Sequence, residues 1–291
     1  MCEKDDLDEM YEISRSRDLS RRQFGALSLG VGLSAMLPRL ADAADTAESE
    51  VEIKTPDGTC DAYLVHPMKG RYPAVLIWPD IFGLRPAFRQ MGKRLAESGY
   101  TVLVINPFYR TQKAPTAPEH PDFNDPATRQ ALFSLAGTLS PATALTDATA
   151  FVGFLDNQPS VDKKRKMGTT GYCMGGPFVF RTAAAFPGRV GAGATFHGGG
   201  LATDKPESPH LLIPKMKAHF LIAIAENDDQ REPEVKNILR DSFAKAKLPA
   251  EIEVYAGTKH GWCPPDSAVY DSAQAERAWG RMSVLFKAEL A

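Results

Sequence analysis

The chain has 291 residues with 34 Lys and Arg against 36 Asp and Glu, so its formal net charge is −2. Hydrophobic residues make up 43% and charged residues 24%, which is the usage of ordinary soluble globular proteins. A charge close to zero argues against nucleic acid as a partner, because no surplus of Lys and Arg is available to neutralise phosphates. Four cysteines are too few for a disulfide-stapled scaffold.

The first 43 residues have the organisation of an export signal. A charged segment leads to Ser20-Arg21-Arg22-Gln23-Phe24, and an uncharged apolar run then extends from Gly25 to Leu37. This run is shorter than the ~20 residues of a membrane-spanning helix, and it has no polar face, which argues against an amphipathic helix. Together with the small-residue triplet Ala41-Asp42-Ala43, the pattern resembles a twin-arginine signal peptide.

We therefore expect a signal peptide over 1–43, a linker over 44–50 and one domain over 51–291. The signal implies the twin-arginine export machinery as a partner and a periplasmic or secreted location. It also implies that the chain has no stable membrane span.

Beyond residue 50, short apolar runs alternate with segments of helical spacing. A hairpin is expected over 51–65, and the four prolines between 111 and 126 predict a loop, either a lid or a passive surface segment. Strands separated by helices of ten or more residues imply an α/β fold with a mostly parallel central sheet and helices on both faces. The expected buried strands are 73–78, 100–105, 166–170, 190–196, 218–225 and 252–255, and the expected helices are 88–98, 128–139, 142–158, 174–186, 233–245 and 267–290.

The segment Gly171-Tyr172-Cys173-Met174-Gly175-Gly176 lies where a predicted strand ends and a helix begins. A nucleophile at such a sharp turn needs small neighbours two residues away on each side, because larger side chains would collide with the strand or helix. Gly171 and Gly175 meet this need, and a helix N-terminus lowers the pKa of a thiol. The pattern predicts Cys173 as a nucleophile. The alternative is a glycine-rich turn around an inert buried cysteine.

Two further motifs follow in the order that such enzymes use, which is nucleophile, acid and histidine. The strand 218–225 ends in Glu226-Asn227-Asp228-Asp229, and the strand 252–255 is followed by a loop that contains His260. The carboxyl ends of parallel strands meet at one edge of a sheet, which is where active sites assemble. The order and placement therefore predict that an Asp and His260 join Cys173 in one site.

With these motifs the sequence resembles the dienelactone hydrolase family of the α/β-hydrolase superfamily, from about Val51 to the C-terminus. The resemblance is carried by Asp80-Ile81-Phe82-Gly83-Leu84, the cysteine elbow, the Glu-Asn-Asp-Asp strand end and Lys259-His260-Gly261-Trp262. It implies the α/β-hydrolase fold, no cofactor, and hydrolysis of small ester or lactone substrates through an acyl-enzyme.

The resemblance also implies a role for each residue of the site. Cys173 is the nucleophile and His260 is the base that takes and returns its proton. Asp228 orients the imidazole, with its neighbour Asp229 as the alternative acid. The backbone N–H groups of two further residues form the oxyanion hole; these are Ile81 and Met174.

Two departures from the family pattern affect the expected substrate. The family usually has Glu at the position of Asp80, where the carboxylate holds the thiol proton; the shorter Asp is expected to hold it more weakly or to reach a water. Members that cleave dienelactones bind the substrate carboxylate with two arginines, of which Arg110 matches one and Trp262-Cys263-Pro264 replaces the other. These departures argue against a strong preference for acidic lactones. They also motivate the alternative of a non-catalytic protein that binds a small ligand in the same pocket.

Several side chains are candidates for substrate contact. Arg110 either holds an anionic group or is a solvated loop residue, and His197 either lines the pocket or hydrogen-bonds to its own loop. The aromatic side chains of Phe82 and Trp262 are expected to line an apolar pocket rather than to take part in the chemistry. The full set of candidates is Phe82, Tyr109, Arg110, His197 and Trp262.

The cysteines also bear on metal and redox chemistry. A metal site needs three or four ligands with suitable spacing. Cys173, His260 and Cys263 could suggest one, but the first two already belong to the predicted triad. We therefore expect no metal. No C-x-x-C motif supports a thiol-redox function. Three cysteines remain after residue 43, and whether Cys60 and Cys263 pair is left open.

Overall fold

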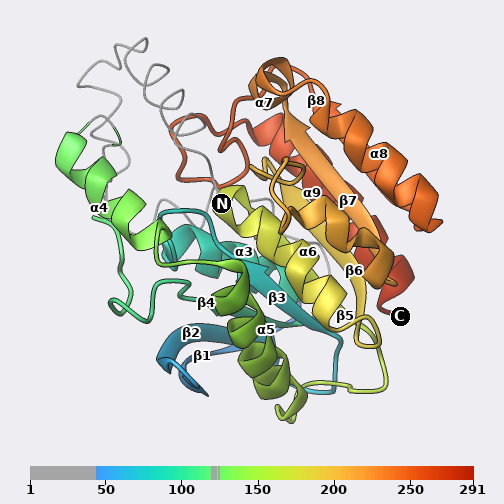
Figure 1. Cartoon of the computed structure of the whole chain (residues 1–291). Coiled ribbons are helices and arrows are strands. Elements are labelled where there is room, and N and C mark those ends of the chain that lie inside the picture. Colours follow the sequence, from blue (N-terminus) through green and yellow to red (C-terminus); the bar gives the residue numbers. More distant parts are fainter. Residues whose placement is uncertain (1–43, 119–122, 124) are drawn as a thin grey trace.

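The structure is a computed structural model and describes residues 44–118, 123 and 125–291. The expected signal peptide over 1–43 lies outside the described residues. The described chain forms a three-layer domain in which an eight-stranded sheet, ordered β1-β2-β4-β3-β5-β6-β7-β8, lies between two layers of helices (Figure 1). No helix within these ranges combines the length and apolar character that a membrane crossing requires.

The sheet is antiparallel at one edge and parallel elsewhere. The hairpin β1 (Thr46–Thr55) and β2 (Gly58–Pro67) pairs antiparallel with β4 (Thr101–Ile105). The parallel part consists of β4, β3 (Ala74–Trp78), β5 (Met167–Tyr172), β6 (Val190–Phe196), β7 (His219–Ala225) and β8 (Ala250–Tyr255). Every residue of β3, β4 and β5 is buried, because a central parallel strand is covered on both faces.

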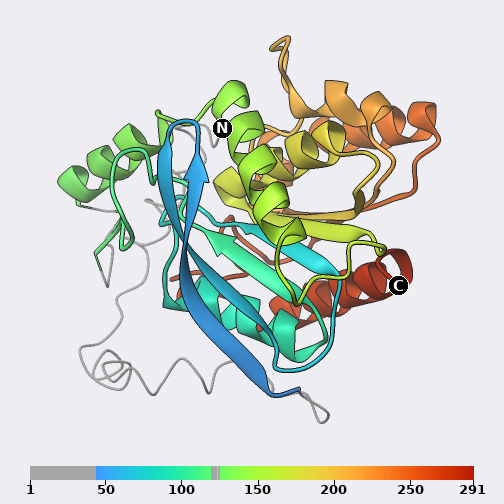
Figure 2. The ribbon, with the colours of Figure 1, turned by 90° about the horizontal axis from the view of Figure 1, so that it is seen from below.

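Helices cover both faces of the sheet, as the alternating sequence pattern predicts (Figure 2). One face is covered by α3 (Pro86–Glu97) and α9 (Ser272–Glu289), which bury Phe88 and Phe286. The other face carries α5 (Pro141–Asp156), α6 (Gly176–Ala185) and α8 (Val235–Ala246). The remaining helices are α4 (Pro126–Ala136), α7 (Glu226–Arg231) and the 3₁₀ segments η2 (Cys173–Gly175) and η3 (Pro209–Lys215). The predicted fold class is confirmed.

The expected linker over 44–50 is wrong for most of its length. Residues 46–50 form the first half of β1 and pair with β2 from Thr46–Pro67 to Glu50–Tyr63. Apart from Ala47 their side chains are polar, and three of the five residues are exposed, so no apolar alternation marks them as a strand in the sequence. Hydrogen bonds such as that from the Tyr63 hydroxyl to Glu48, at 2.6 Å, hold this edge strand in place.

Two boundaries near the site also differ from the expectation. The segment after β7 continues directly into α7, although its sequence has no apolar periodicity. The last helix begins at Ser272 rather than 267, because the carboxylate of Asp271 accepts a hydrogen bond from the backbone N–H of Gln274, at 3.1 Å. The preceding segment, with Pro264 and Pro265, remains an irregular loop that follows His260.

Candidate active site

Cys173 occupies a strained turn between β5 and α6. Its φ is +50°, a left-handed conformation that is uncommon for any residue with a side chain. A Cβ at Gly171 would lie 2.3 Å from the carbonyl oxygen of Gly175, and a Cβ at Gly175 would lie 2.2 Å from that of Trp78. The backbone thus leaves room only for glycine on both sides of Cys173, and the same close packing holds the strained residue in place.

His260 and Asp228 meet at the carboxyl edge of the sheet. The Nδ1 atom of His260 lies 2.8 Å from the Oδ2 atom of Asp228. Asp229 points elsewhere, since both of its oxygens accept hydrogen bonds from the Lys236 ammonium, at 2.6 and 2.7 Å. The structure therefore brings Asp228, and not Asp229, to His260.

The surroundings of His260 favour its protonated form. Burial acts to lower the pKa of His260, but the negative charges of Asp228 and Cys173, each of which accepts a hydrogen bond from the ring, raise it well above its usual range. His260 is fully buried and Cys173 is 3% exposed, so these interactions act with little screening by water. A thiolate next to a cationic histidine is the reactive form of a cysteine nucleophile.

Two residues that the sequence analysis missed hold this geometry. The side-chain oxygen of Asn227 accepts a hydrogen bond from the backbone N–H of His260, at 2.8 Å. Arg231 donates to the second carboxylate oxygen of Asp228, at 3.0 Å. Arg231 stands three residues after Asp228, a spacing at which helical side chains meet, but this signal is visible only once residues 226–231 are known to form a helix.

The proposed oxyanion donors lie in two segments that pack against each other. Ile81 follows β3 and Met174 follows β5, and these neighbouring parallel strands are paired from Val75–Gly168 to Trp78–Gly171. Both residues are buried. Contact of Gly175 with the carbonyl oxygens of Trp78 and Pro79 brings the cysteine turn against the segment that leads to Ile81.

Asp80 forms an ion pair with Arg85. The two terminal nitrogens of Arg85 donate to the two oxygens of Asp80, at 2.6 and 2.9 Å, and the backbone N–H of Phe82 donates to Asp80 at 3.0 Å. Arg85 also donates twice to Asp266, at 2.6 and 2.9 Å. Arg85 thus joins the loop that carries Ile81 to the loop that follows His260. Burial raises the pKa of Asp80, and Arg85 opposes that shift. That the Asp80 carboxylate holds the proton of the Cys173 thiol stays a prediction.

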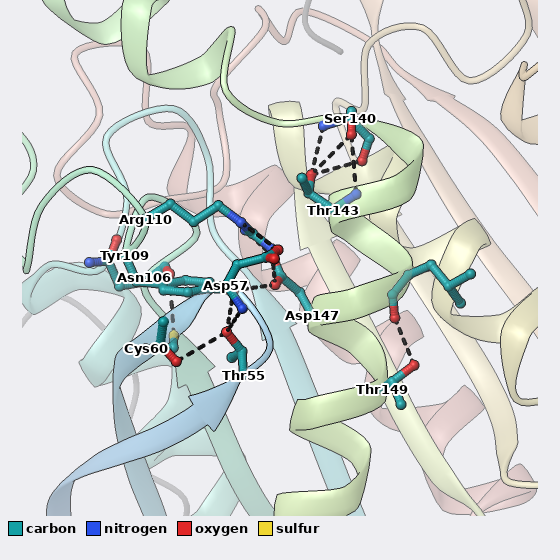
Figure 3. Close-up of polar contacts among 12 residues, drawn as sticks. Thr55, Asp57, Cys60, Asn106, Tyr109, Arg110, Ser140, Thr143, Asp147 and Thr149 are labelled. Carbon is teal, nitrogen blue, oxygen red and sulfur yellow. Dashed lines mark hydrogen bonds and ion pairs between the residues drawn. The ribbon is translucent and has the colours of Figure 1, made fainter.

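Arg110 and Tyr109 belong to a separate polar cluster, which we call the Arg110 network: Thr55, Asp57, Tyr109, Arg110 and Asp147. The guanidinium donates twice to Asp147, at 2.8 and 2.7 Å, and twice to Asp57, at 3.0 and 2.6 Å. The Tyr109 hydroxyl donates to Asp147 at 2.7 Å and lies 2.8 Å from the Thr55 hydroxyl. Figure 3 shows Arg110 directed at Asp147 on α5. Substrate contact by Arg110 or Tyr109 stays a prediction.

The other three candidates for substrate contact lie in different surroundings. His197 packs edge-to-face on His260, with ring centroids 5.2 Å apart, and lies 6.3 Å from Trp262. Trp262 is buried and stacks on Tyr255 at 4.8 Å. Phe82 is half-buried and meets Phe123 edge-to-face at 6.1 Å. Of these three, His197 is in direct ring contact with His260.

The other cysteines are chemically distinct from Cys173. Among the described residues, Cys60, Cys173 and Cys263 form no disulfide, and Cys60 and Cys263 lie in the cores on opposite faces of the sheet. Burial raises the pKa of the Cys60 and Cys263 thiols, which stay protonated at neutral pH. In the part of the chain that the structure describes, no group of three or more His, Cys, Asp or Glu is placed to hold a metal ion.

Comparison with known proteins confirms the family and the fold. Residues 60–290 match the dienelactone hydrolase family. The chain is 28% identical over 214 residues to the carboxymethylenebutenolidase of Rhodococcus opacus, covering 70% of this chain and 79% of that protein. Two solved structures each align with 84% of this chain and 99% of their own. One is a dienelactone hydrolase-like promiscuous phosphotriesterase from metagenomic libraries, with a TM-score of 0.69 and 21% identity. The other is the dienelactone hydrolase of Anabaena variabilis, with a TM-score of 0.58 and 18% identity. The chain belongs to the dienelactone hydrolase family.

Proposed function

We propose that this protein hydrolyses small ester or lactone bonds with Cys173 as the nucleophile, His260 as the general acid and base, and Asp228 as the residue that orients His260. The observation that carries the proposal is the environment of His260. It is buried between an acidic partner and a thiol, and both raise its pKa. That environment pairs a proton donor with a sulfur anion before substrate arrives.

In the acylation step, the Cys173 thiolate attacks the carbonyl carbon and forms a carbon–sulfur bond. The N–H groups of Ile81 and Met174 stabilise the negative charge that develops on the carbonyl oxygen. The carbon–oxygen bond to the leaving alkoxide then breaks, and the His260 imidazolium gives that alkoxide its proton. The products are an alcohol, a thioester on Cys173 and a neutral His260.

In the deacylation step, a water molecule attacks the thioester carbonyl while His260 takes one of its protons. The carbon–sulfur bond breaks and releases a carboxylic acid. Cys173 is again a thiolate and His260 is again an imidazolium, so the cycle restores the starting pair. Asp228 stabilises this imidazolium in both steps.

The Arg110 network bears on the substrate class. Every nitrogen of the Arg110 guanidinium donates to Asp57 or Asp147, and the two carboxylates together outweigh its charge. A substrate carboxylate at this position would meet a guanidinium whose donors already have partners. We therefore propose that esters and lactones without a free carboxylate are good substrates.

The test is turnover of 4-nitrophenyl acetate and small neutral lactones by wild-type protein and Cys173→Ala, with Cys263→Ala as the control. Cys173→Ala is expected to lose about 10³-fold or more of kcat/KM, whereas Cys263→Ala keeps the activity, because the Cys263 thiol stays protonated in the core. Among Cys60, Cys173 and Cys263, iodoacetamide should label Cys173 alone. Equal rates for wild type and Cys173→Ala would remove Cys173 from the proposal. Tight binding of a small ligand without turnover would favour the alternative of a non-catalytic binding protein.

The N-terminal pattern supports a second proposal, which is export through the twin-arginine machinery. It rests on Arg21 and Arg22 ahead of a short apolar run. Fractionation of a bacterial host should find the wild-type protein outside the cytoplasm and the variant Arg21→Lys/Arg22→Lys inside it. Retention of the full-length wild-type chain in the cytoplasm would contradict export.

A further inference from the structure

His197 is a buried imidazole whose ring nitrogens have no neighbouring partner. Its side chain is 1% exposed, and neither nitrogen hydrogen-bonds to another side chain or to another residue's backbone in the described part of the chain. A buried polar group without a partner lowers stability, and such groups in a native structure call for an explanation. The explanation that fits this position is a partner that is present during the reaction.

The backbone at His197 is also strained. Its φ is +41°, beside the +50° of Cys173, and these are two of the three non-glycine residues with positive φ in the described chain. Residues held in this conformation lower stability and cluster at functional sites. A Cβ at Gly176 would lie 2.8 Å from the Cα of Gly198, so the chain after His197 is fixed against the first turn of α6.

These constraints place His197 next to the reacting atoms. The parallel pair of β5 and β6 aligns Tyr172 with Phe196, so Cys173 and His197 each come directly after the end of one of two neighbouring strands. The His197 ring meets the His260 ring at 5.2 Å. Since Nδ1 of His260 is bound to Asp228, the other ring nitrogen of His260 is the one that serves the reaction.

We propose that His197 positions the hydrolytic water in deacylation, by accepting a hydrogen bond from the water proton that His260 does not take. This inference rests on the proposed acyl-enzyme mechanism. One O–H of the water then points at His260 and the other at His197. The lone pair of the water oxygen is free to attack the thioester carbon. Only the proton on the His260 side is transferred, so the proton and electron balance of deacylation is unchanged.

The charge state of His197 suits this role. Burial lowers the pKa of His197 well below its usual range, the positive charge of His260 adds to that effect, and contact with its own backbone opposes it. Neutral imidazole keeps one nitrogen lone pair that accepts a hydrogen bond. The two histidines therefore differ in role: His260 cycles between charged and neutral forms, and His197 stays neutral.

The test separates the two half-reactions in His197→Asn and His197→Gly. Both residues tolerate positive φ, so these variants are expected to fold. The matched control is Lys247→Asn, because Lys247 has a φ of +55° at the end of α8. The first release of 4-nitrophenolate from 4-nitrophenyl acetate measures acylation, and rapid-quench mass spectrometry of the adduct on Cys173 measures its decay.

Acylation by His197→Gly is expected to stay within about threefold of wild type, while decay of the adduct slows about tenfold or more, with a smaller loss in His197→Asn. Hydroxylamine, which attacks the thioester without activation by a base, should restore decay in both variants. Equal slowing of both half-reactions, or unchanged decay, would overturn the role of His197 and leave the acyl-enzyme intact. Absence of any adduct on wild-type Cys173 would instead overturn the proposed function.

Discussion

Two polar regions, one partly buried around Arg110 and one buried around His260, lie at the carboxyl edge of the same sheet, and they are built in opposite ways. In the Arg110 network, every guanidinium nitrogen meets a carboxylate oxygen and the Tyr109 hydroxyl also has a carboxylate partner. Around Cys173 and His260, by contrast, two residues have positive φ and the His197 nitrogens have no neighbouring partner.

The difference separates a structural role from a catalytic one. A buried polar group with all its partners in place stabilises the fold, and removing one partner is costly. Strain and unmet hydrogen bonds lower stability, so they persist only where the surrounding structure enforces them and the reaction uses them. We therefore expect substitutions in the Arg110 network to affect mainly the free energy of unfolding, and substitutions around His260 to affect mainly catalysis.

The largest expected effect is on catalysis, in Asp228→Asn. Loss of the carboxylate should lower kcat/KM about 10⁴-fold with little change in the denaturation midpoint. His260 must be protonated to release the alcohol, so activity is present below its pKa and lost as pH rises through it. Because Asp228 raises that pKa, the alkaline limb of the kcat/KM profile should move to lower pH in the variant. Asp229→Asn, next in the chain but bound to Lys236, is the control and should keep the wild-type profile.

The next largest effect is on stability, in Arg110→Met. Asp147 is 2% exposed at its side chain, and an unpaired buried carboxylate should lower the free energy of unfolding by about 3–5 kcal/mol, measured by urea denaturation. Per folded molecule, kcat/KM for a neutral ester should stay within about twofold. The double variant Arg110→Met/Asp147→Asn should recover part of the loss, because the buried charge is gone. A selective loss of turnover for an anionic ester in Arg110→Met would instead make Arg110 a substrate ligand and end the contrast between the regions.

The smallest expected effect concerns the turn that carries Cys173, the proposed nucleophile, where we expect one glycine to affect both packing and catalysis. Gly175→Ala places a methyl group against the backbone oxygens of Trp78 and Pro79. Backbone atoms cannot rotate away from the methyl group as the end of a flexible side chain could. We expect a loss of about 1–3 kcal/mol together with a loss of activity, measured by thermal unfolding and ester turnover. Gly153→Ala is the matched control on α5, where nothing lies within 4 Å of the added Cβ. It should be neutral or stabilise by up to about 1 kcal/mol.

The fold could be predicted from the sequence wherever burial leaves a pattern. Runs such as Ala74–Trp78 and Thr101–Ile105 are apolar throughout because both faces of these strands are covered. The first half of β1 has no such pattern, since its edge position leaves polar side chains in water. The six residues of α7 also have no apolar periodicity from which a helix could be predicted, although acidic residues in the first turn suit a helix N-terminus.

The candidate site was predictable to the extent that its residues follow strand ends. The order of Cys173, the acidic segment and His260 along the chain indicates one shared edge of the sheet. The choice between Asp228 and Asp229 depends on α7, which turns one toward His260 and the other toward Lys236. The partners of Arg110 stand 53 and 37 residues away in the sequence, and no local pattern connects residues so far apart.

The close packing around Gly171 and Gly175 has a consequence for the residue that we propose as the nucleophile. The atoms that enforce the turn are backbone carbonyls and a neighbouring valine side chain, and none of them depends on the sulfur of Cys173. A serine at position 173 would therefore be presented by the same turn, beside the same histidine. The backbone turn that presents the side chain at position 173 does not depend on whether the attacking atom is sulfur or oxygen. One substitution could therefore replace a thiol with an alcohol without a new fold.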